Sequence, residues 1–326
     1  MKAISIKVVI VCMFDDDDIP GENLGELHYW KKNLHLDKQL AFSFTKNNLF
    51  LNENRGVIAI TTGMGSTLAT AAIMALGLDE RFDFRQSYWL VAGVAGGNPH
   101  QVSLGSVVWS DFLVDGDLCH QIDNREIPAN WPSGIFPLFS KGPEDVSNPN
   151  AYFECYQLNT QLLNWAFQFT ASIQIKDSVD ITTERKGYKD FPAAQQPPAV
   201  VKGSQLCGKT YWHGKLMNQW ATDWVRSATH NQGQFFTSGM EDSGSFLALS
   251  LLTQAKKADL DRFMILRAVS NYTFSPASKN DPENFFNDAN QYAGMAVALK
   301  GAYDVGSKVV NHIVENWDTF KNKSWH

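Results

Sequence analysis

The chain has 326 residues, 44% of them hydrophobic, so it can bury a substantial core without disulfides or metal ions. Its formal net charge is −6 and it has no block of lysines and arginines, which argues against a nucleic-acid partner. No apolar run is long enough to span a bilayer, and the four cysteines form no CxxC pair. We therefore expect a globular protein with no membrane span, no metal site and no cofactor.

The first predicted element is a buried strand over 4–14, which runs into four consecutive aspartates at 15–18. Although its apolar part resembles the core of a signal peptide, no small-residue cleavage site follows it. A short hairpin is predicted over 41–51.

The most informative stretch follows that hairpin. A buried strand over 57–60 leads into a glycine-rich loop, a helix over 68–78, a second buried strand over 88–91 and a second glycine-rich turn. A strand–helix–strand unit of this kind implies a parallel strand pair in an α/β sheet, and such sheets bind ligands at the carboxyl ends of their strands. We therefore expect the two turns to approach a polar ligand through their backbone; they contain Gly63, Gly65 and Ser66, and Gly93, Val94, Ala95 and Gly96.

The rest of the chain continues to alternate between strands and helices. Strands are predicted over 105–117 and 263–269, a strand followed by a turn over 200–211, and helices over 153–171, 216–229, 243–257 and 289–314. Proline-rich segments predict surface loops near 130–150 and 190–200. Because no internal repeat or composition change divides the chain, we expect a single domain over 1–326.

Several motifs resemble those of the purine nucleoside permease family, and the match spans nearly the whole chain. They lie at 61–63, 71–78, 91–96, 122–128, 241–242 and 267–271. That family is similar to the nucleoside phosphorylase/nucleosidase superfamily, which includes methylthioadenosine nucleosidase. The resemblance implies an α/β fold: a three-layer α/β/α sandwich around a mixed twisted sheet. The family label says transport, but without a membrane span the chain alone is not expected to form a channel or carrier.

The resemblance also implies where a nucleoside would bind. Met240 and Glu241 match the superfamily's Met-Glu pair before a helix, whose glutamate accepts hydrogen bonds from the ribose 2′ and 3′ hydroxyls. The alternative is an acid that only stabilises a helix N-terminus. Ser270 and Asn271 stand where the superfamily usually has Ser-Asp, whose aspartate binds purine N7. An asparagine has no titrating proton to give, so this departure puts protonation of the leaving purine in doubt. An asparagine at this position resembles phosphorylases that prefer 6-oxopurines.

A further acid is expected after the first strand. In the nucleosidases a carboxylate at this point orients the attacking water, and the register from Met13 favours Asp16 or Asp17 as that base. The alternatives are a solvated acidic turn and a metal cluster. The cluster is disfavoured because four consecutive aspartates cannot all point one way on an extended chain. Tyr211 and Trp212 match a segment whose aromatic ring stacks on the base, although aromatic residues of this kind are often plain core.

The nucleophile that would cleave the ribosidic bond is either water or phosphate. The uridine phosphorylase branch holds phosphate with an arginine where this chain has Leu90, and a dianion needs such a cation. Backbone N–H groups of Gly63, Gly65 and Ser66 at a helix N-terminus, or Arg125, remain alternatives. We therefore predict a purine nucleoside N-ribosidase that uses water and acts on nucleosides of the inosine, guanosine or adenosine class.

Three alternatives stay open: a purine nucleoside phosphorylase that uses phosphate, a non-catalytic nucleoside-binding protein that assists transport, and a storage or structural protein on the same fold. Superfamily sites often borrow a residue from a neighbouring subunit, so a homo-oligomer is expected. Relatives are commonly exported, so we favour an exported protein, periplasmic or extracellular, whose signal has been removed, over a cytoplasmic one.

Overall fold

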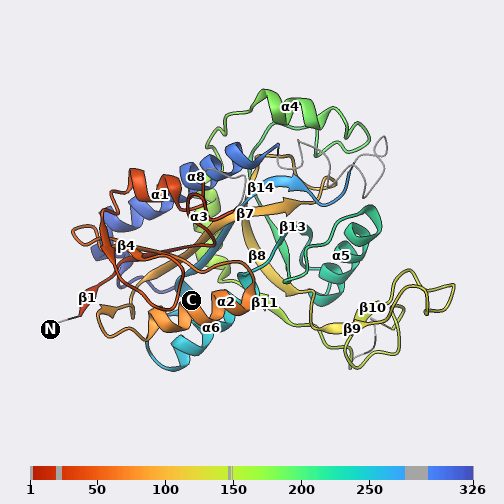
Figure 1. Cartoon of the computed structure of the whole chain (residues 1–326), viewed down its shortest axis with the longest axis horizontal. Helices are drawn as coiled ribbons and strands as arrows, with labels where there is room; N and C mark the ends of the chain where they lie inside the picture. The colour runs from red at the N-terminus through yellow and green to blue at the C-terminus, as the bar shows by residue number, and fades with distance from the viewer. Residues whose placement is uncertain (1–2, 20–23, 146–147, 149, 276–292, 326) are drawn as a thin grey trace.

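The computed structural model describes residues 3–19, 24–145, 148, 150–275 and 293–325. Its centre is a mixed ten-stranded sheet with the order β11-β8-β12-β13-β7-β2-β5-β4-β3, in which β14 pairs with both β7 and β8 (Figure 1). The strands of the sheet are β2 (Val8–Cys12), β3 (Lys38–Leu40), β4 (Leu49–Asn52), β5 (Val57–Thr61), β7 (Tyr88–Gly97), β8 (Val107–Asp115), β11 (Cys155–Gln157), β12 (Val200–Cys207), β13 (Phe235–Gly239) and β14 (Phe263–Tyr272).

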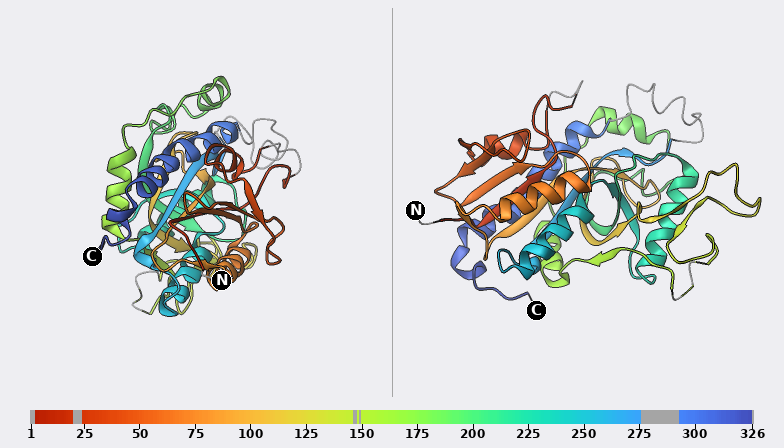
Figure 2. Two further views of the ribbon diagram at one scale, coloured as in Figure 1. Left: turned by 90° about the vertical axis from the view of Figure 1, so that its left-hand side faces the viewer. Right: turned by 60° about the horizontal axis from the view of Figure 1, so that its bottom comes forward.

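Helices cover both faces of this sheet, as the turned views of Figure 2 show. One face packs against α1 (His28–Asn33), α3 (Thr160–Thr170) and α8 (Met295–Glu315), and the other against α2 (Ser66–Gly77) and α6 (Asp242–Gln254). The five residues of β2 are all buried, and alternate side chains enter the two cores, as period-two geometry requires. The expected three-layer α/β/α arrangement is therefore confirmed.

Five strands of the sheet close into a ring. β7 pairs with β13, β13 with β12, β12 with β8, β8 with β14, and β14 again with β7. The ring mixes parallel and antiparallel pairs, and it brings the ends of β7, β13 and β14 together. The remaining elements pack around this framework: α4 (Val179–Arg185), α5 (Lys215–Ala228), η1 (Leu260–Arg262), α9 (Trp317–Phe320), and the short pairs β1 (Ile4–Ser5) with β6 (Phe82–Asp83) and β9 (Cys119–Gln121) with β10 (Ile135–Pro137).

Some element boundaries differ from the sequence predictions. The predicted first strand is divided into β1 and β2, and the predicted hairpin over 41–51 is the antiparallel pair β3–β4, whose connection spans 41–48. The segment 153–171 begins with β11 before α3 starts, and α1, α4 and β13 had not been predicted. Of the long closing helix, α8 is described from Met295, while the predicted start at 289–292 lies outside the described residues.

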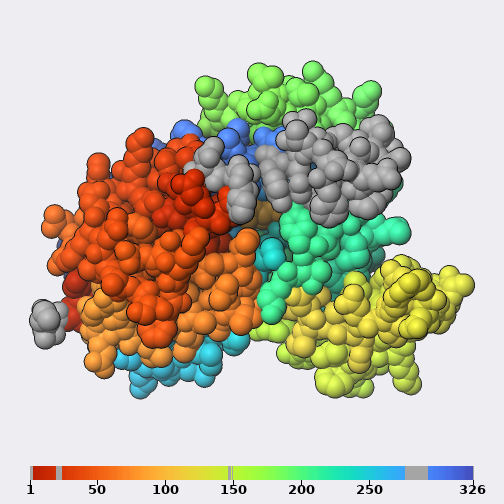
Figure 3. Space-filling view, viewed as in Figure 1, coloured from red at the N-terminus to blue at the C-terminus, as the bar shows by residue number. Residues whose placement is uncertain are grey.

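The connection from β8 to β11 forms an arm that carries β9 and β10. It includes the predicted loop near 130–150 and projects at one end of the molecule, drawn in yellow in Figures 1 and 3. The second predicted loop, near 190–200, leads from α4 into β12. In the part of the chain that the structure describes, no helix combines the length and hydropathy needed to cross a bilayer.

Candidate functional site

A pocket of about 290 Å³ lies where several strands of the ring end. Its wall comes from the residues after β2, from the ends of β7, β13 and β14, and from the loop between β12 and α5. It is lined by Met13, Phe14, Ile19, Glu26, Met64, Val94, Ala95, Gly96, Thr210, Tyr211, Trp212, Ser238, Gly239, Met240, Glu241, Arg267, Ser270, Asn271, Thr273 and Met295. The strand ends therefore form a concave, largely apolar site with a few convergent polar groups, which is the usual form of a small-molecule site.

Glu241 presents its carboxylate to this pocket from the start of α6. It is the N-cap residue of that helix and is buried, with 4% of its surface exposed. One oxygen accepts a hydrogen bond from the backbone N–H of Gly65 at 3.0 Å, and the other from Arg267 Nη2 at 2.9 Å. Gly65 has a φ of +96°, a conformation that glycine adopts without strain. Burial raises the pKa of Glu241, although Arg267 opposes the shift.

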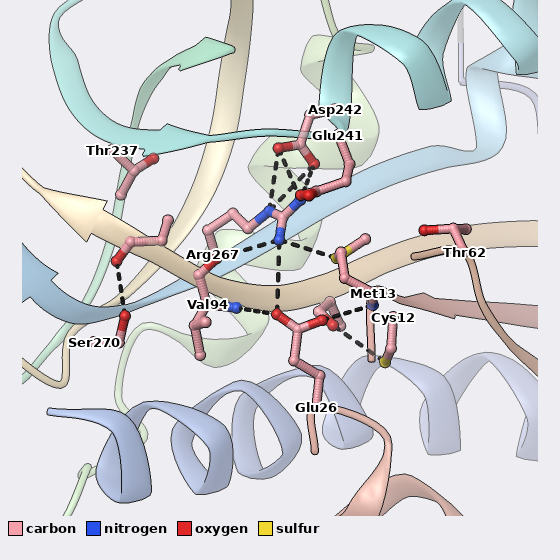
Figure 4. Close-up of polar contacts among 12 residues, drawn as sticks. Cys12, Met13, Glu26, Thr62, Val94, Thr237, Glu241, Asp242, Arg267 and Ser270 are labelled. Atoms are coloured by element: carbon pink, nitrogen blue, oxygen red, sulfur yellow. Dashed lines mark hydrogen bonds and ion pairs between the residues drawn. The ribbon is translucent and has the colours of Figure 1, made fainter. Parts of the chain in front are cut away.

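Arg267 is the centre of a buried charge cluster (Figure 4). It extends from β14, and its Nε and Nη2 donate to both carboxylate oxygens of Asp242 over 2.9–3.2 Å. Asp242 also accepts a hydrogen bond from Gln205. Burial disfavours the charge of Arg267, but Asp242, Glu241 and Glu26 outweigh that effect and raise its pKa. The guanidinium is thus a permanent cation: its Nε and Nη2 donate to carboxylates, and its Nη1 donates to the sulfur of Met13 and the carbonyl of Val94.

Glu26 is the third carboxylate of the cluster, and the sequence analysis missed it. Its two oxygens accept hydrogen bonds from the backbone N–H groups of Met13 and Val94, both at 2.7 Å, and Arg267 Nη1 lies 3.9 Å away. Burial raises its pKa to about 7, partly offset by Arg267. Because Glu26 stands in the connection before α1 and its hydrogen-bond partners are main-chain groups, no periodicity or motif marks it in the sequence.

Asp16 and Asp17, the expected bases, do not border the pocket. Asp16 accepts a hydrogen bond from the Gly25 N–H at 2.8 Å and lies 2.9 Å from His28 Nδ1. Partial burial opposes ionisation of Asp16, but these bonds lower its pKa. Asp17 is exposed. The geometry thus argues against both as the base, because a turn folds the acidic run away from the pocket; Asp16 instead holds the residues on either side of Glu26.

Ser270 and Asn271 both reach the pocket from the end of β14. Simple alternation would point neighbouring residues to opposite faces, but β14 has a register irregularity between Val269 and Asn271. Ser270 Oγ donates to Asn271 Oδ1 at 2.9 Å, while Asn271 Nδ2 lies 3.4 Å from the hydroxyl of Tyr211 and from the carbonyl of Tyr272. The serine therefore orients the amide so that a donor faces the side of Tyr211.

Tyr211 and Trp212 line the pocket from the loop before α5, although only Trp212 is substantially covered. Tyr211 is 49% exposed. The ring of Trp212 meets the ring of Trp220 edge-on, with centroids 6.2 Å apart. Tyr211 is thus close to Asn271, and Trp212 lines the same pocket.

The first glycine-rich turn is already engaged within the protein. The N–H of Gly63 donates to the carbonyl of Met13, and that of Gly65 donates to Glu241. Ser66 is the first residue of α2. Arg125 lies in the arm, pairs with Asp123 and has an 88% exposed side chain outside the pocket lining. Gly63, Gly65, Ser66 and Arg125 thus do not line the pocket.

The comparison with solved structures supports this fold. Futalosine hydrolase of Helicobacter pylori superposes with a TM-score of 0.53 at 13% identity, covering 93% of this chain and 98% of that one. A 5′-methylthioadenosine nucleosidase mutant from the same organism, with methylthioadenosine in its active site, gives 0.52 at 14%, covering 93% and 99%. Identities this low establish the fold and not the activity.

The sequence comparisons establish the family. The model of the purine nucleoside permease family matches residues 5–324, so the chain belongs to that family. A probable purine nucleoside permease of Schizosaccharomyces pombe is 28% identical over 274 residues, which cover 82% of this chain and 78% of the relative. A purine nucleoside permease of Candida albicans is 27% identical over 269 residues, 81% of this chain and 66% of the relative.

Proposed function

We propose that this protein is a purine nucleoside N-ribosidase, which cleaves the bond between the base and the ribose with water as the nucleophile. The observation that carries the proposal is the pairing of two buried carboxylates, Glu26 and Glu241, across one arginine at the pocket wall. Cleavage of a ribosidic bond develops positive charge on the sugar, and two carboxylates beside the sugar would favour that charge.

Glu241 is proposed to bind the ribose. Each carboxylate oxygen can accept two hydrogen bonds. The bonds from Gly65 and Arg267 use one site on each oxygen, so Glu241 can still accept hydrogen bonds from the 2′ and 3′ hydroxyls. Met240, beside it in the pocket wall, supplies apolar contact for the sugar.

Glu26 is proposed to orient and deprotonate the attacking water. A general base works best when its pKa is close to the working pH, and burial raises the pKa of Glu26 to about 7. Its two backbone bonds fix the carboxylate, and each oxygen keeps a lone pair for a water. This assignment replaces the one that the sequence suggested for Asp16 or Asp17.

Asn271 is proposed to hold the base. Its Nδ2 donor suits the acceptor atoms N7 and O6 of a 6-oxopurine, so inosine and guanosine are the expected substrates. Asn271 cannot protonate the leaving base, and departure of the base would instead rely on stabilisation of the negative charge by this hydrogen bond.

Water is favoured over phosphate because of the charges at the site. Among the described residues that line the pocket, Arg267 is the only cation, and its donors are held within the protein by Asp242, Glu241, the Met13 sulfur and the Val94 carbonyl. A phosphate dianion placed near Glu26 and Glu241 would meet two negative groups with no free cation to offset the repulsion. Phosphorolysis is therefore the less favoured alternative.

A non-catalytic role is the second candidate. The relatives are named as permeases, and Asn271 lacks an acidic proton. A protein that binds purine nucleosides and delivers them to a separate transporter would need the same pocket. Tight nucleoside binding without release of base would favour this candidate.

The deciding experiment is incubation of the purified protein with inosine, guanosine and adenosine, with and without phosphate, followed by identification of the sugar product. Free ribose at equal rates in both conditions would support the hydrolase. Ribose 1-phosphate formed only with phosphate would replace it with a phosphorylase. Loss of turnover in Glu241→Ala, with folding unchanged, would tie the activity to this pocket.

A further inference from the structure

A second cavity lies directly beside the nucleoside pocket. It measures about 580 Å³ and shares two lining residues, Thr210 and Trp212, with the first pocket. The arm forms one wall and the body forms the other, with α5 beside the arm in Figures 1 and 3. The segment 210–212 thus borders both spaces.

The body wall of this cavity is apolar and aromatic. Trp212 and Trp220 meet edge-on with their centroids 6.2 Å apart, and Met217 and Leu206 lie next to them. The indole N–H of Trp220 is buried and has no acceptor among the described residues. Aromatic corners of this kind hold planar apolar groups.

The arm wall is polar, and three of its acceptors already have donors within the protein. Asp117 accepts a hydrogen bond from the Lys209 N–H, Asp123 pairs with Arg125, and the side-chain oxygen of Asn124 accepts from Gly134. These acceptors are thus engaged within the protein, and the body wall offers the larger apolar contact. An uncharged group that rests against the tryptophans fits it best.

The second cavity lies on the base side of the pocket. Asn271 Nδ2, which would face N7 and the six-position of a purine, is 3.4 Å from the hydroxyl of Tyr211. Tyr211 stands between Thr210 and Trp212, the two residues that both spaces share. A substituent on the six-position would therefore point toward the segment 210–212 and the space beyond it.

We propose that the second cavity is a subsite for a substituent on the purine six-position, so that the substrates include purine nucleosides with an apolar or aromatic group there. The proposal rests on the proposed placement of the base at Asn271, and it goes beyond it by naming a substrate class that an unsubstituted nucleoside site would exclude. Such a group would leave the pocket past Tyr211 and pack on Trp220 and Met217.

The test compares substituted nucleosides with their parents: N6-benzyladenosine with adenosine, and O6-benzylinosine with inosine. In the wild-type protein we expect kcat/KM for at least one benzyl compound to be no lower than for its parent. Met217→Trp, which fills the cavity, and Trp220→Ala, which removes its aromatic wall, should each lower the ratio of substituted to parent kcat/KM by roughly five- to tenfold. Gln219→Ala, an exposed neighbour on α5 outside both linings, is the matched control and should leave the ratio unchanged.

Activity on the parent nucleoside shows whether each variant is folded, because none of the three substituted residues lines the first pocket. Cleavage of the parents with exclusion of both benzyl compounds by the wild type would overturn the subsite, as would an unchanged ratio in both cavity variants. If the parents bind without being cleaved, the same ratios are taken from dissociation constants, and the subsite then stands or falls without the hydrolase. If neither parents nor benzyl compounds bind, both proposals are wrong.

Discussion

Gly93 and Glu26 lie in direct contact: a Cβ built on Gly93 would fall 2.3 Å from Glu26 Oε1 and 2.7 Å from Arg267 Nη1. No side chain fits there unless the buried carboxylate moves. Gly93 lies within β7 and not in the turn that the sequence predicted after residue 91, and it makes room there for a side chain of the protein.

Gly93→Ala should destabilise the protein and displace Glu26. We expect a loss of about 1–3 kcal/mol in the free energy of unfolding, the usual cost of overpacking a well-filled interior, together with a fall in turnover. Urea unfolding measures the first effect and base release the second. Gly96→Ala is the control for stability, because its Cβ would meet nothing closer than 3.4 Å. Equal stability of the two variants would contradict the contact.

Glu26→Gln should remove the proposed base while keeping the shape of the side chain. We expect turnover to fall by about 10²- to 10⁴-fold, the range typical of general acid–base catalysis, while nucleoside binding persists. Asp16→Asn is the matched comparison, since Asp16 lies ten residues earlier and outside the pocket. The opposite pattern, with Asp16→Asn inactive and Glu26→Gln active, would restore the assignment made from the sequence.

The sequence predicted the layered fold and much of the pocket wall, including Glu241, Ser270 and Asn271, because these residues stand in motifs at the ends of strongly apolar strands. It did not predict Glu26, because a lone acid in a loop carries no period and its partners are backbone groups. It also expected Asp16 or Asp17 beside the substrate, whereas neither lines the pocket, since a strand register cannot foresee the turn that follows the strand. The roles themselves remain predictions.

The rate should depend on pH through Glu26. Burial raises the pKa of this acid from 4.5 to about 7, so kcat/KM for inosine should rise tenfold per pH unit below about pH 7 and level off above it. A pH–rate profile of the wild type tests this, and residual activity in Glu26→Gln should lack the step. A profile flat from pH 5 to 8 would exclude Glu26 as the base.

Stability should change over the same interval and with a definite sign. The folded protein holds the Glu26 proton more tightly than the unfolded chain, so this group stabilises the fold fully below about pH 4.5, and its contribution is lost as pH rises through about 7. As pH rises from 5 to 8, the melting temperature of Glu26→Gln should therefore rise relative to that of the wild type, on top of a pH-independent cost because the amide NH2 faces a backbone N–H donor. Melting temperatures of the two proteins, measured side by side, would show a constant difference if the carboxylate were already ionised at pH 5.

Arg267→Met should be far more damaging than loss of a surface arginine. It would leave Glu26, Glu241 and Asp242 buried close together without a cation, and we expect a loss of about 3–5 kcal/mol in the free energy of unfolding. Adding Asp242→Asn should restore part of that loss. Arg85→Met, which breaks the exposed pair with Asp83, should leave the urea midpoint unchanged. A midpoint for Arg267→Met equal to that of Arg85→Met would show that the cluster contributes little.

Asn271→Asp should shift the preference for the base. Ser270 holds the amide so that Nδ2 points toward Tyr211, where the base is proposed to lie, and this donor suits the O6 acceptor of inosine. A carboxyl group would instead accept from the 6-amino group of adenosine. We expect the ratio of kcat/KM for adenosine over inosine to rise about tenfold, which corresponds to one hydrogen bond exchanged for another. Asn218→Asp, a buried amide outside the pocket lining, serves as the comparison. An unchanged ratio in Asn271→Asp would place the base elsewhere.

The two short bonds that hold Glu26 have a consequence for how this protein tolerates sequence change. Both donors are main-chain N–H groups, at positions 13 and 94, and every amino acid except proline supplies the same donor. The side chains at these two positions can therefore change without loss of the hydrogen bonds that hold Glu26. Relatives in which residues 13 and 94 have diverged can keep the same two hydrogen bonds to the carboxylate. The residue types at those two positions would not reveal them.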